Sequence, residues 1–344
     1  MRDMGKIVTA IIGLGRIASL LEDDPLREKP CTHAGAMYLN PQCILSAGCD
    51  IDAERRRLFA EKWQVPVYAD AAEMISIHKP QILSIATHPD SHYHYCRLAA
   101  FCGVPVIICE KPLAGNIGEA RKIGRLAKTG KKPVIITNHE RRYSGDYLRA
   151  KEILESKKLG TLLGVNAKLY MGINRRLVDV FWHDGTHLAD AIMFLTGLTL
   201  KHCKSWGASL FSRGGTAWLE GSLKSAQKSA PIREKAPPVP ALIEIGAGRD
   251  HLVFEMEFSC EKGRLRIGNG IFEVWESAPS AYAQKFRSLR QTNETFNGPT
   301  GYFANMIKDA VFCAKKTGRQ PRSSAADGLR VIEYLNSVMP WQTD

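Results

Sequence analysis

The stretch Ile7-Val8-Thr9-Ala10-Ile11-Ile12-Gly13-Leu14-Gly15-Arg16-Ile17-Ala18 decides the fold of the first half of the chain. Its β-branched apolar run predicts a buried strand from Lys6 to Ile12, and the turn that follows matches the pattern G-x-G-x-x-G/A. In such a turn Gly13 permits the tight bend, Gly15 lets the backbone approach a pyrophosphate, and Ala18 leaves room for close helix packing. We therefore predict a dinucleotide site formed by Gly13, Gly15, Arg16 and Ile17.

The next predicted strand supports this motif. Cys43–Cys49 ends at Asp50, where a carboxylate can accept hydrogen bonds from a ribose 2′-hydroxyl and repels a 2′-phosphate. This favours NAD over NADP. Arg55, Arg56 and Arg57 lie just beyond the strand end, close enough for one of them to accept a 2′-phosphate, so NADP stays open. The alternative interpretation is a structural glycine turn with an incidental aspartate.

Strands and helices alternate along residues 1–143. This alternation predicts a Rossmann-type α/β domain with a doubly wound parallel sheet. The predicted strands are Lys6–Ile12, Cys43–Cys49, Pro66–Tyr68, Ile82–Ala86, Val106–Cys109 and Val134–Thr137, and the helices are Ala53–Lys62, Ala71–His78, Tyr93–Phe101 and Gly118–Thr129. Ser19–Tyr38 is longer than a minimal crossover, so we expect a loop to break the first helix.

The pattern changes in residues 144–344, where few helices separate the strands. This predicts an α+β domain with an open, mostly antiparallel sheet. Gly221–Pro240 is rich in Lys, Ser, Ala and Pro and predicts a polar loop or insertion. The final helices can pack back on the first domain. The predicted helices are Tyr147–Ser156, His187–Thr196, Tyr302–Lys316 and Ala325–Ser337, and the strands are Leu162–Tyr170, Ser205–Ser212, Leu242–Gly246, Leu252–Ser259, Arg264–Ile267 and Ile271–Trp275.

Composition favours an ordinary soluble globular protein of two domains. The chain has 344 residues, 44% of them hydrophobic, and the net charge of +12 is spread over short runs instead of one basic tract. This argues against nucleic acid, and leaves solvated faces or a basic cleft for an anionic ligand. No apolar run approaches the roughly 18 residues of a membrane span. The nine cysteines are scattered without a CxxC pair, so we expect a reducing cytoplasm, no disulfide framework and no metal site.

Two further predicted strand ends carry candidate site residues. Parallel strands present their carboxyl ends to the ligand crevice. Here Ala86–His92 follows one strand and Cys109–Leu113 follows another. A lysine in the second segment can donate a hydrogen bond or act as a tuned acid, although a surface lysine in a turn is the plainer interpretation. We add to the cofactor site Thr87, His88, Pro89, His92, Glu110 and Lys111, with ordinary capping or packing as the alternative for both histidines.

Taken together, these motifs resemble the glucose–fructose oxidoreductase / inositol dehydrogenase / MocA family of NAD(P)-dependent sugar and polyol dehydrogenases. The resemblance implies a nicotinamide between the Glu-Lys-Pro turn and the second domain's sheet, and a homodimer or homotetramer built through that sheet. The motifs run nearly from end to end: Gly13–Ala18, Asp50, Pro89–His92, Glu110-Lys111-Pro112, Asn138–Tyr143, Lys158–Gly160, Gly185–Asp190, Lys262–Leu265 and Gly318–Pro321.

The resemblance also implies catalytic roles. Lys111 and His187 match the residues that flank the reacting carbinol in this family. A histidine suits the base that takes the hydroxyl proton while hydride leaves for the nicotinamide. We therefore expect His187 to be the base and Lys111 to orient the hydroxyl, although either can be the immediate proton acceptor.

One position departs from the family pattern. Many members carry an aspartate four residues before the histidine, whereas here His183 stands there and the acid is Asp184. Asp184 then either supports His187 or caps the helix, and His183 either contacts substrate or replaces the carboxylate. Asp190 can bind a substrate hydroxyl or pair with a basic residue of the first domain. Two further substrate-cleft candidates are Arg142 and Tyr143.

Three functions remain open from the sequence. The leading hypothesis is an NAD(P)-dependent dehydrogenase acting on the CH–OH group of a sugar, polyol or sugar derivative. A non-catalytic dinucleotide-binding sensor is the alternative, since the displaced aspartate is compatible with it, but retention of Lys111 and His187 favours the enzyme. An oxidoreductase acting on imines, lactones or double bonds would share the fold.

Overall fold

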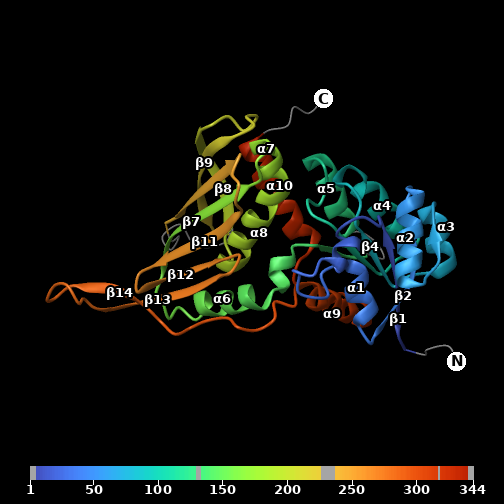
Figure 1. The fold of residues 1–344 in the computed structure, drawn as a ribbon, viewed down its shortest axis with the longest axis horizontal. Coiled ribbons are helices and arrows are strands. Elements are labelled where there is room, and N and C mark those ends of the chain that lie inside the picture. Colours follow the sequence, from blue (N-terminus) through green and yellow to red (C-terminus); the bar gives the residue numbers. More distant parts are fainter. Residues whose placement is uncertain (1–4, 129–132, 226–236, 317, 340–344) are drawn as a thin grey trace. The chain divides into compact units, whose positions relative to one another are not determined.

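A computed structural model describes residues 5–128, 133–225, 237–316 and 318–339 (Figure 1). The chain divides into two compact units. The N-terminal unit comprises Met1–Ser144 and Pro299–Ile332, and the C-terminal unit comprises Gly145–Gly298 and Glu333–Asp344. The last part of the chain therefore contributes to both units.

Six parallel strands form the sheet of the N-terminal unit, in the order β3-β2-β1-β4-β5-β6. Every residue of β4 and β5 is buried, as expected for a parallel sheet covered on both faces. This confirms the predicted doubly wound α/β fold. The strands are β1 Ile7–Ile12, β2 Cys43–Cys49, β3 Val67–Tyr68, β4 Ile82–Ile85, β5 Val106–Cys109 and β6 Val134–Thr137.

Side-chain caps fix where several helices of this unit begin. Thr32, Asp52, Asp70 and Asn116 each accept a hydrogen bond from a backbone N–H of the following first turn. The loop expected after the glycine turn is present, because a short 3-10 turn, η1, and a separate helix replace one continuous helix. The elements are η1 Leu20–Asp23, α1 His33–Leu39, α2 Ala53–Trp63, α3 Ala71–His78, α4 Pro89–Phe101, α5 Ile117–Leu126 and η2 Glu140–Tyr143.

Helix α9 (Tyr302–Lys315) completes the core of the N-terminal unit. Its buried residues Phe303, Met306 and Ile307 belong to the same apolar cluster as Ile11 of β1 and Ile108 of β5. Figure 1 shows this helix, in red, beside the blue α1. The apolar face of α9 is thus as much a part of the first sheet's core as the neighbouring strands are.

The C-terminal unit has an eight-stranded sheet in the order β14-β13-β12-β11-β7-β10-β9-β8. All neighbours are antiparallel except β7 and β10, which run parallel. Alternating burial along β11 shows one covered and one open face, which confirms the predicted open α+β sheet. The strands are β7 Leu162–Met171, β8 Thr199–Gly207, β9 Gly215–Lys224, β10 Val239–Ala247, β11 Val253–Cys260, β12 Gly263–Gly268, β13 Ile271–Pro279 and β14 Arg287–Gln291.

Five helical elements complete the described secondary structure. In the C-terminal unit, α7 and α8 are joined by a short π turn, η3, and α6 packs against α8. No helix in the described part of the chain is long and apolar enough to cross a membrane. The elements are α6 Gly145–Glu155, α7 Leu177–Asp179, η3 Val180–Asp184, α8 Gly185–Thr196 and α10 Ala325–Val338.

Several strands of the C-terminal unit differ from the prediction in their bounds or were not predicted. The strand expected at Ser205–Ser212 is β8, which ends at Gly207, and neither β9 nor β14 was predicted. Part of the expected Gly221–Pro240 loop is the end of β9, while residues 226–236 lie outside the described residues. Small and charged side chains on the open face masked the alternating burial of β9, in which Ala217, Leu219 and Leu223 face the core.

Candidate functional site

The glycine turn after β1 leaves bare backbone at its surface. Gly13 has φ +85°, and a Cβ there would lie 2.7 Å from the carbonyl oxygen of Ala86. A Cβ on Gly15 would meet only Nη1 of Arg55, at 3.8 Å, so the space over Gly15 is open. The turn therefore has one glycine required by backbone packing and one that lets a ligand approach. This cradle fits a pyrophosphate.

Asp50 is tied to this turn. Its Oδ2 accepts a hydrogen bond from Leu14 N at 2.7 Å, and its Oδ1 accepts one from Asp52 N at 2.9 Å. The carboxylate is nearly buried, and Nη1 of the half-exposed Arg55 lies 3.7 Å from Oδ2. Asp50 thus connects the ends of β1 and β2, the place where the sequence predicts that its carboxylate binds a ribose.

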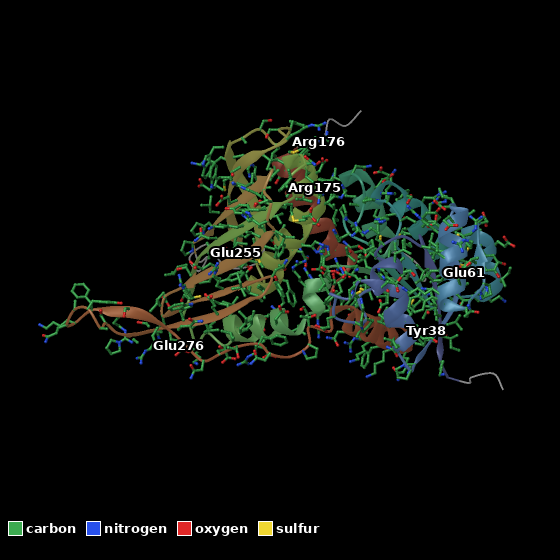
Figure 2. The ribbon with its side chains drawn as sticks, in the orientation of Figure 1. Tyr38, Glu61, Arg175, Arg176, Glu255 and Glu276 are labelled. Atoms are coloured by element: carbon green, nitrogen blue, oxygen red, sulfur yellow. The ribbon has the colours of Figure 1, made fainter. Side chains whose placement is uncertain are left out.

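Only one of the three neighbouring arginines approaches the turn among the contacts of the described residues. Arg56 donates to the carbonyl oxygens of Asp50 and Ile51. Arg57 pairs with Glu54 and with Glu61, which is labelled in Figure 2. Arg55 is therefore the candidate for contact with a 2′-phosphate.

The segment between the turn and α1 is anchored to the rest of the unit. Glu22 accepts hydrogen bonds from Thr32 Oγ1 and Cys31 N. Glu28 accepts hydrogen bonds from the backbone N–H groups of Thr300 and Gly301, at the start of α9. The inserted segment is consequently held in place by its own carboxylates and by the last part of the chain.

Glu110 lies at the centre of a buried polar network. Its Oε1 is 2.7 Å from His33 Nε2 and also accepts a hydrogen bond from Asn138 Nδ2. Ser84 Oγ lies 3.0 Å from the other ring nitrogen of His33. Both ring nitrogens of His33 therefore have a hydrogen-bonding partner, Glu110 at Nε2 and Ser84 at Nδ1.

Burial would by itself raise the pKa of Glu110, but its contacts outweigh that effect. The hydrogen bond and charge of His33 act first, followed by the hydrogen bond from Asn138 and the charge of Lys111, and together they lower the pKa of the carboxyl. Glu110 is therefore an ionised group inside the unit. Its oxygens already bind protein groups, since Oε2 accepts from Lys111 N at 3.2 Å. This arrangement favours a supporting role over the predicted direct contact with the cofactor.

His92 links the two predicted strand-end segments. It is fully buried, with Nε2 3.1 Å from Thr87 O and Nδ1 3.1 Å from Pro112 O. Burial lowers the pKa of His92, although hydrogen bonds to these carbonyls oppose the shift. The ring packs the β4–α4 loop against the Glu-Lys-Pro turn, so its position favours the packing alternative over the cofactor role. Lys111, between these buried groups, is half-buried.

The remaining predicted residues of the N-terminal unit fall into two groups. Near the strand ends, Arg16 and His88 are exposed, whereas Ile17, Thr87 and Pro89 are half-buried. His88 precedes α4 but its side chain makes no capping hydrogen bond, and Pro89 is the first residue of the helix.

Arg142 and Tyr143 lie inside the unit. Arg142 Nη1 is 3.0 Å from Asp327 Oδ1 and also donates to Arg322 O. The fully buried Tyr143 donates from its hydroxyl to Asp309 Oδ2 at 3.2 Å. Burial raises the pKa of Tyr143 well above its ordinary value, and the charge of Asp309 adds to this shift. These contacts favour a structural role for both residues over the predicted substrate role.

The C-terminal unit carries the second group of predicted catalytic residues. His187 lies half-buried in the first turn of α8, and His183 is exposed in the π turn before it. Asp184, at the junction, makes no capping hydrogen bond because the residues before it are already helical, so the cap alternative is wrong. Asp190 is buried on the same helix.

Arg175, which no sequence motif singles out, binds Asp184. Its Nη1 lies 2.8 Å from Asp184 Oδ2, while the adjacent Arg176 forms a separate ion pair with Asp179. Both arginines are labelled in Figure 2. A π turn often accompanies a functional site because it redirects side chains within a helix. The acid that the family pattern places one residue earlier is thus held here by a neighbouring guanidinium.

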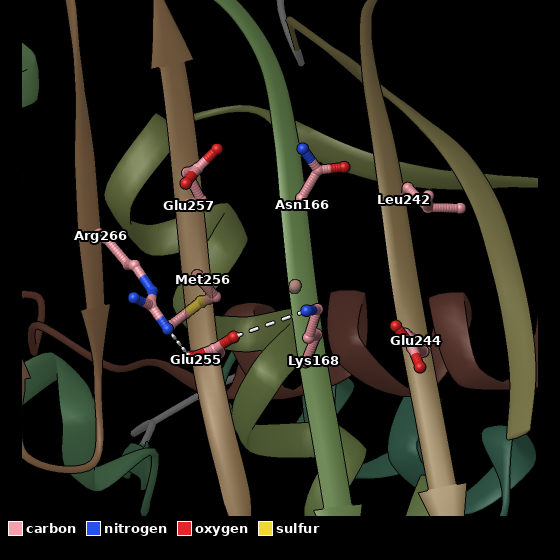
Figure 3. Close-up of a pocket in the computed structure, with 9 residues that line it drawn as sticks. Asn166, Lys168, Leu242, Glu244, Glu255, Met256, Glu257 and Arg266 are labelled. Atoms are coloured by element: carbon pink, nitrogen blue, oxygen red, sulfur yellow. Dashed lines mark hydrogen bonds and ion pairs between the residues drawn. The ribbon is translucent and has the colours of Figure 1, made fainter. Parts of the chain in front are cut away.

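A shallow hollow of about 330 Å³ lies on the open face of the second sheet (Figure 3). Glu255 faces Lys168 Nζ at 3.9 Å and Arg266 Nη2 at 2.5 Å. Glu257 pairs in turn with Arg264. This face is therefore covered with paired charges. No group of three or more potential metal ligands occurs among the residues that the structure describes.

Residues 7–138 match the model of the GFO_IDH_MocA family, an oxidoreductase family with an NAD-binding Rossmann fold. Residues 7–138 thus carry the NAD-binding domain of the Gfo/Idh/MocA family. The predicted family resemblance is thereby confirmed, and so is the dinucleotide-binding fold of this Gfo/Idh/MocA unit.

The curated relatives of this chain are distant. An inositol 2-dehydrogenase of Salmonella paratyphi B is 26% identical over 162 residues, which are 46% of this chain and 45% of the relative. A D-glucoside 3-dehydrogenase of Escherichia coli K12 is 27% identical over 224 residues, which are 60% of this chain and 58% of the relative. The chain thus matches about half the length of these relatives.

Solved structures extend the likeness of fold beyond the Gfo/Idh/MocA unit. A UDP-N-acetylglucosamine 3-dehydrogenase from Acidithiobacillus ferrooxidans superposes with a TM-score of 0.72. The superposition covers 97% of this chain and 96% of that chain at 17% sequence identity. At this identity the match shows a shared fold and nothing about substrate.

Proposed function

We propose that this protein is an NAD(P)-dependent dehydrogenase that oxidises a secondary alcohol of a sugar, polyol or sugar derivative. One observation carries the proposal. The glycine turn, Asp50 and Lys111 follow β1, β2 and β5 at the same edge of one parallel sheet. Ligands of such sheets bind at the carboxyl ends of the strands. A dinucleotide cradle and a proton-handling lysine therefore belong to one face of one unit.

The names of the relatives support the substrate class. The two curated relatives described above are dehydrogenases named for inositol and for D-glucosides. Both names describe ring compounds with several secondary hydroxyls. We therefore place cyclic polyols and glycosides first among the candidate substrates.

The chain would divide the chemistry as follows. The glycine turn and Asp50 would hold the pyrophosphate and a ribose of the dinucleotide, which would supply the hydride acceptor. Lys111 donates a hydrogen bond to the substrate hydroxyl and stabilises the developing alkoxide, while His187 removes the proton. Glu110 supports the Lys111 backbone, and Asp184 with Arg175 fixes the charge at the start of α8.

NAD is the cofactor that Asp50 favours, because its carboxylate repels a 2′-phosphate. Arg55 weakens that repulsion, since its guanidinium lies beside the same carboxylate. We therefore propose use of NAD with measurable use of NADP. We also propose that copies of the chain associate through the charged open face of the second sheet, which a light-scattering mass measurement tests.

The test is turnover by the purified full chain. Reduction of NAD+ and NADP+ is followed by absorbance against a panel of inositols, glucosides, nucleotide sugars and sugar acids. We expect reduction with at least one cyclic polyol or glycoside. Lys111→Ala should abolish it and leave NAD+ affinity, measured by calorimetry, near that of the wild type. Binding of NAD+ without turnover on any member of the panel would contradict the proposal.

A non-catalytic sensor is the second candidate, and the Asp184–Arg175 ion pair favours it. If the aspartate serves only this pair, His187 lacks the family's carboxylate. The same panel separates the two functions. A sensor would bind NAD+ and change its unfolding temperature on addition of a sugar without reducing the dinucleotide.

A further inference from the structure

A groove of about 1010 Å³ lies at the edge of the first sheet opposite the glycine turn. It is bounded by the segments that lead into β5 and β6, by the second half of α5, and by residues 318–329. All of its lining residues belong to the N-terminal unit. Because β5 spans four residues, the two edges are about 13 Å apart along the strand. The groove is thus separate from the dinucleotide cradle.

The floor of the groove is apolar. Val104 and Pro105 before β5, Ile135 of β6, and Pro321 with Leu329 line it from three segments of the chain. A floor of this kind binds an aromatic ring or a short hydrocarbon body by excluding water. The side chains of this floor offer no polar group that could orient a purely ionic ligand.

The rim of the groove is basic. Arg121 and Arg125 have the i, i+4 spacing that places side chains along one face of α5. Lys128 lies in the turn just after this helix, and Arg319 adds a fourth charge. No Asp or Glu is among the described lining residues. Arg121 and Lys128 form no ion pair within the described part of the chain, whereas Arg319 pairs with Asp309 at 3.3 Å.

A helix dipole explains only part of this arrangement. Cations near the end of α5 are stabilised by the negative end of the helix, which accounts for Arg125 and Lys128. Arg121 stands in the middle of the helix, outside the last turn. Its position beside an apolar floor suits an anionic ligand.

The wall opposite α5 is fixed by hydrogen bonds. Thr137 N donates to Ser323 O at 3.2 Å, and Ser323 Oγ donates to Thr137 O at 2.7 Å. Asp327 accepts hydrogen bonds from Ser324 N and Ser324 Oγ and pairs with the buried Arg142. Small-molecule sites are usually largely preformed, and this groove meets that condition.

We propose that this groove is a second ligand site, which binds a small organic anion with an apolar body. The body lies on the floor and a phosphate, sulfonate or carboxylate group meets the arginines of the rim. The groove volume is at the upper end of the range for a site that binds one small molecule. Arg121 and Lys128 provide two cations that can pair with one anionic group.

The experiment uses the full chain and two fluorescent probes. Anilinonaphthalene sulfonate has an apolar body and an anion, and N-phenylnaphthylamine has a similar body without charge. We expect the sulfonate to bind about tenfold more tightly. Arg121→Glu and Lys128→Glu should each weaken it about tenfold, and added salt should weaken it in the wild type. Binding should persist with excess NAD+, and so does not depend on the proposed dehydrogenase activity.

Lys122→Glu is the matched control. Lys122 neighbours Arg121 on α5 but points to the ring of Tyr93 instead of the groove, so this variant should bind the sulfonate as the wild type does. Ala326→Trp should block the groove and remove the high-affinity phase, with circular dichroism showing that the fold is kept. Equal weakening by Lys122→Glu, wild-type affinity in Arg121→Glu, or displacement by NAD+ would each overturn the proposal.

Discussion

His33 Nε2 lies 2.7 Å from Oε1 of Glu110, and both side chains are buried. The pair connects the first helix of the N-terminal unit with the Glu-Lys-Pro turn. A buried carboxylate is stable only when its lone pairs are satisfied, so His33 and Asn138 are what keep Glu110 ionised at that place.

His33→Ala should therefore destabilise the protein. Loss of the hydrogen bond to a charged acceptor is expected to lower the free energy of unfolding by about 2 kcal/mol, measured in urea. His78→Ala is the control, since His78 contacts Tyr68 near the surface and touches no buried charge among the described contacts. An equal loss in the two variants would show that the Glu110 network adds no particular stability.

The Glu110 network also predicts a dependence of stability on pH. The pKa of Glu110 is lower in the folded protein than its ordinary value of 4.5. Its contribution to stability is thus fully present above that value and is lost as the pH falls through the lower folded pKa. Urea unfolding of Glu110→Gln should show a shallower loss of stability in this acidic range than the wild type shows. The exposed Glu73→Gln should keep the wild-type slope.

Two glycines of one turn should respond differently to the same substitution. Gly13→Ala places a Cβ against the Ala86 backbone in a left-handed conformation, so it should lower the unfolding temperature and abolish dinucleotide binding. Gly15→Ala meets only the end of Arg55, so the unfolding temperature should stay near the wild-type value while NAD+ affinity falls. Unchanged NAD+ affinity in Gly15→Ala would contradict the proposed cradle.

Arg55 should set the tolerance for NADP. Arg55→Ala removes the cation beside Asp50, so we expect NADP+ affinity to fall about tenfold relative to NAD+ affinity. Arg57→Ala is the matched control, because its guanidinium is held by Glu54 and Glu61. Calorimetric titration with both dinucleotides measures the ratio of NADP+ affinity to NAD+ affinity. A change of this ratio in Arg57→Ala as large as that in Arg55→Ala would contradict the proposed role of Arg55.

Local signals predicted much of the N-terminal unit. The glycine turn, Asp50 and the strand ends can each be recognised from a few consecutive residues. The parallel sheet could therefore be predicted from the sequence. His33 was missed because its partner Glu110 lies 77 positions away and nothing in the spacing joins them. Only the fold brings such a pair together.

The C-terminal unit was harder to predict for a physical reason. Strand β9 places the polar Thr216, Glu220 and Ser222 on the open face and the small Gly221 on the covered face, so its composition resembles that of a loop. The pairing of Asp184 with Arg175 depends on the π turn, which sequence periodicity does not reveal. Tyr143 and Arg142 look polar enough for a cleft, yet their partners on the last helices bury them.

The share of α9 in the first core has a consequence for biosynthesis. Phe303, Met306 and Ile307 leave the ribosome after every strand of both sheets has been made. During translation the apolar face that α9 covers therefore stays exposed after the early strands have been made. Chaperones or other unfolded chains can bind it in that period. A fragment that ends at Ser144 would carry every residue of the dinucleotide cradle and still lack the helix that closes its core. Such a fragment should be captured by chaperones in the cell, whereas the full chain is released folded.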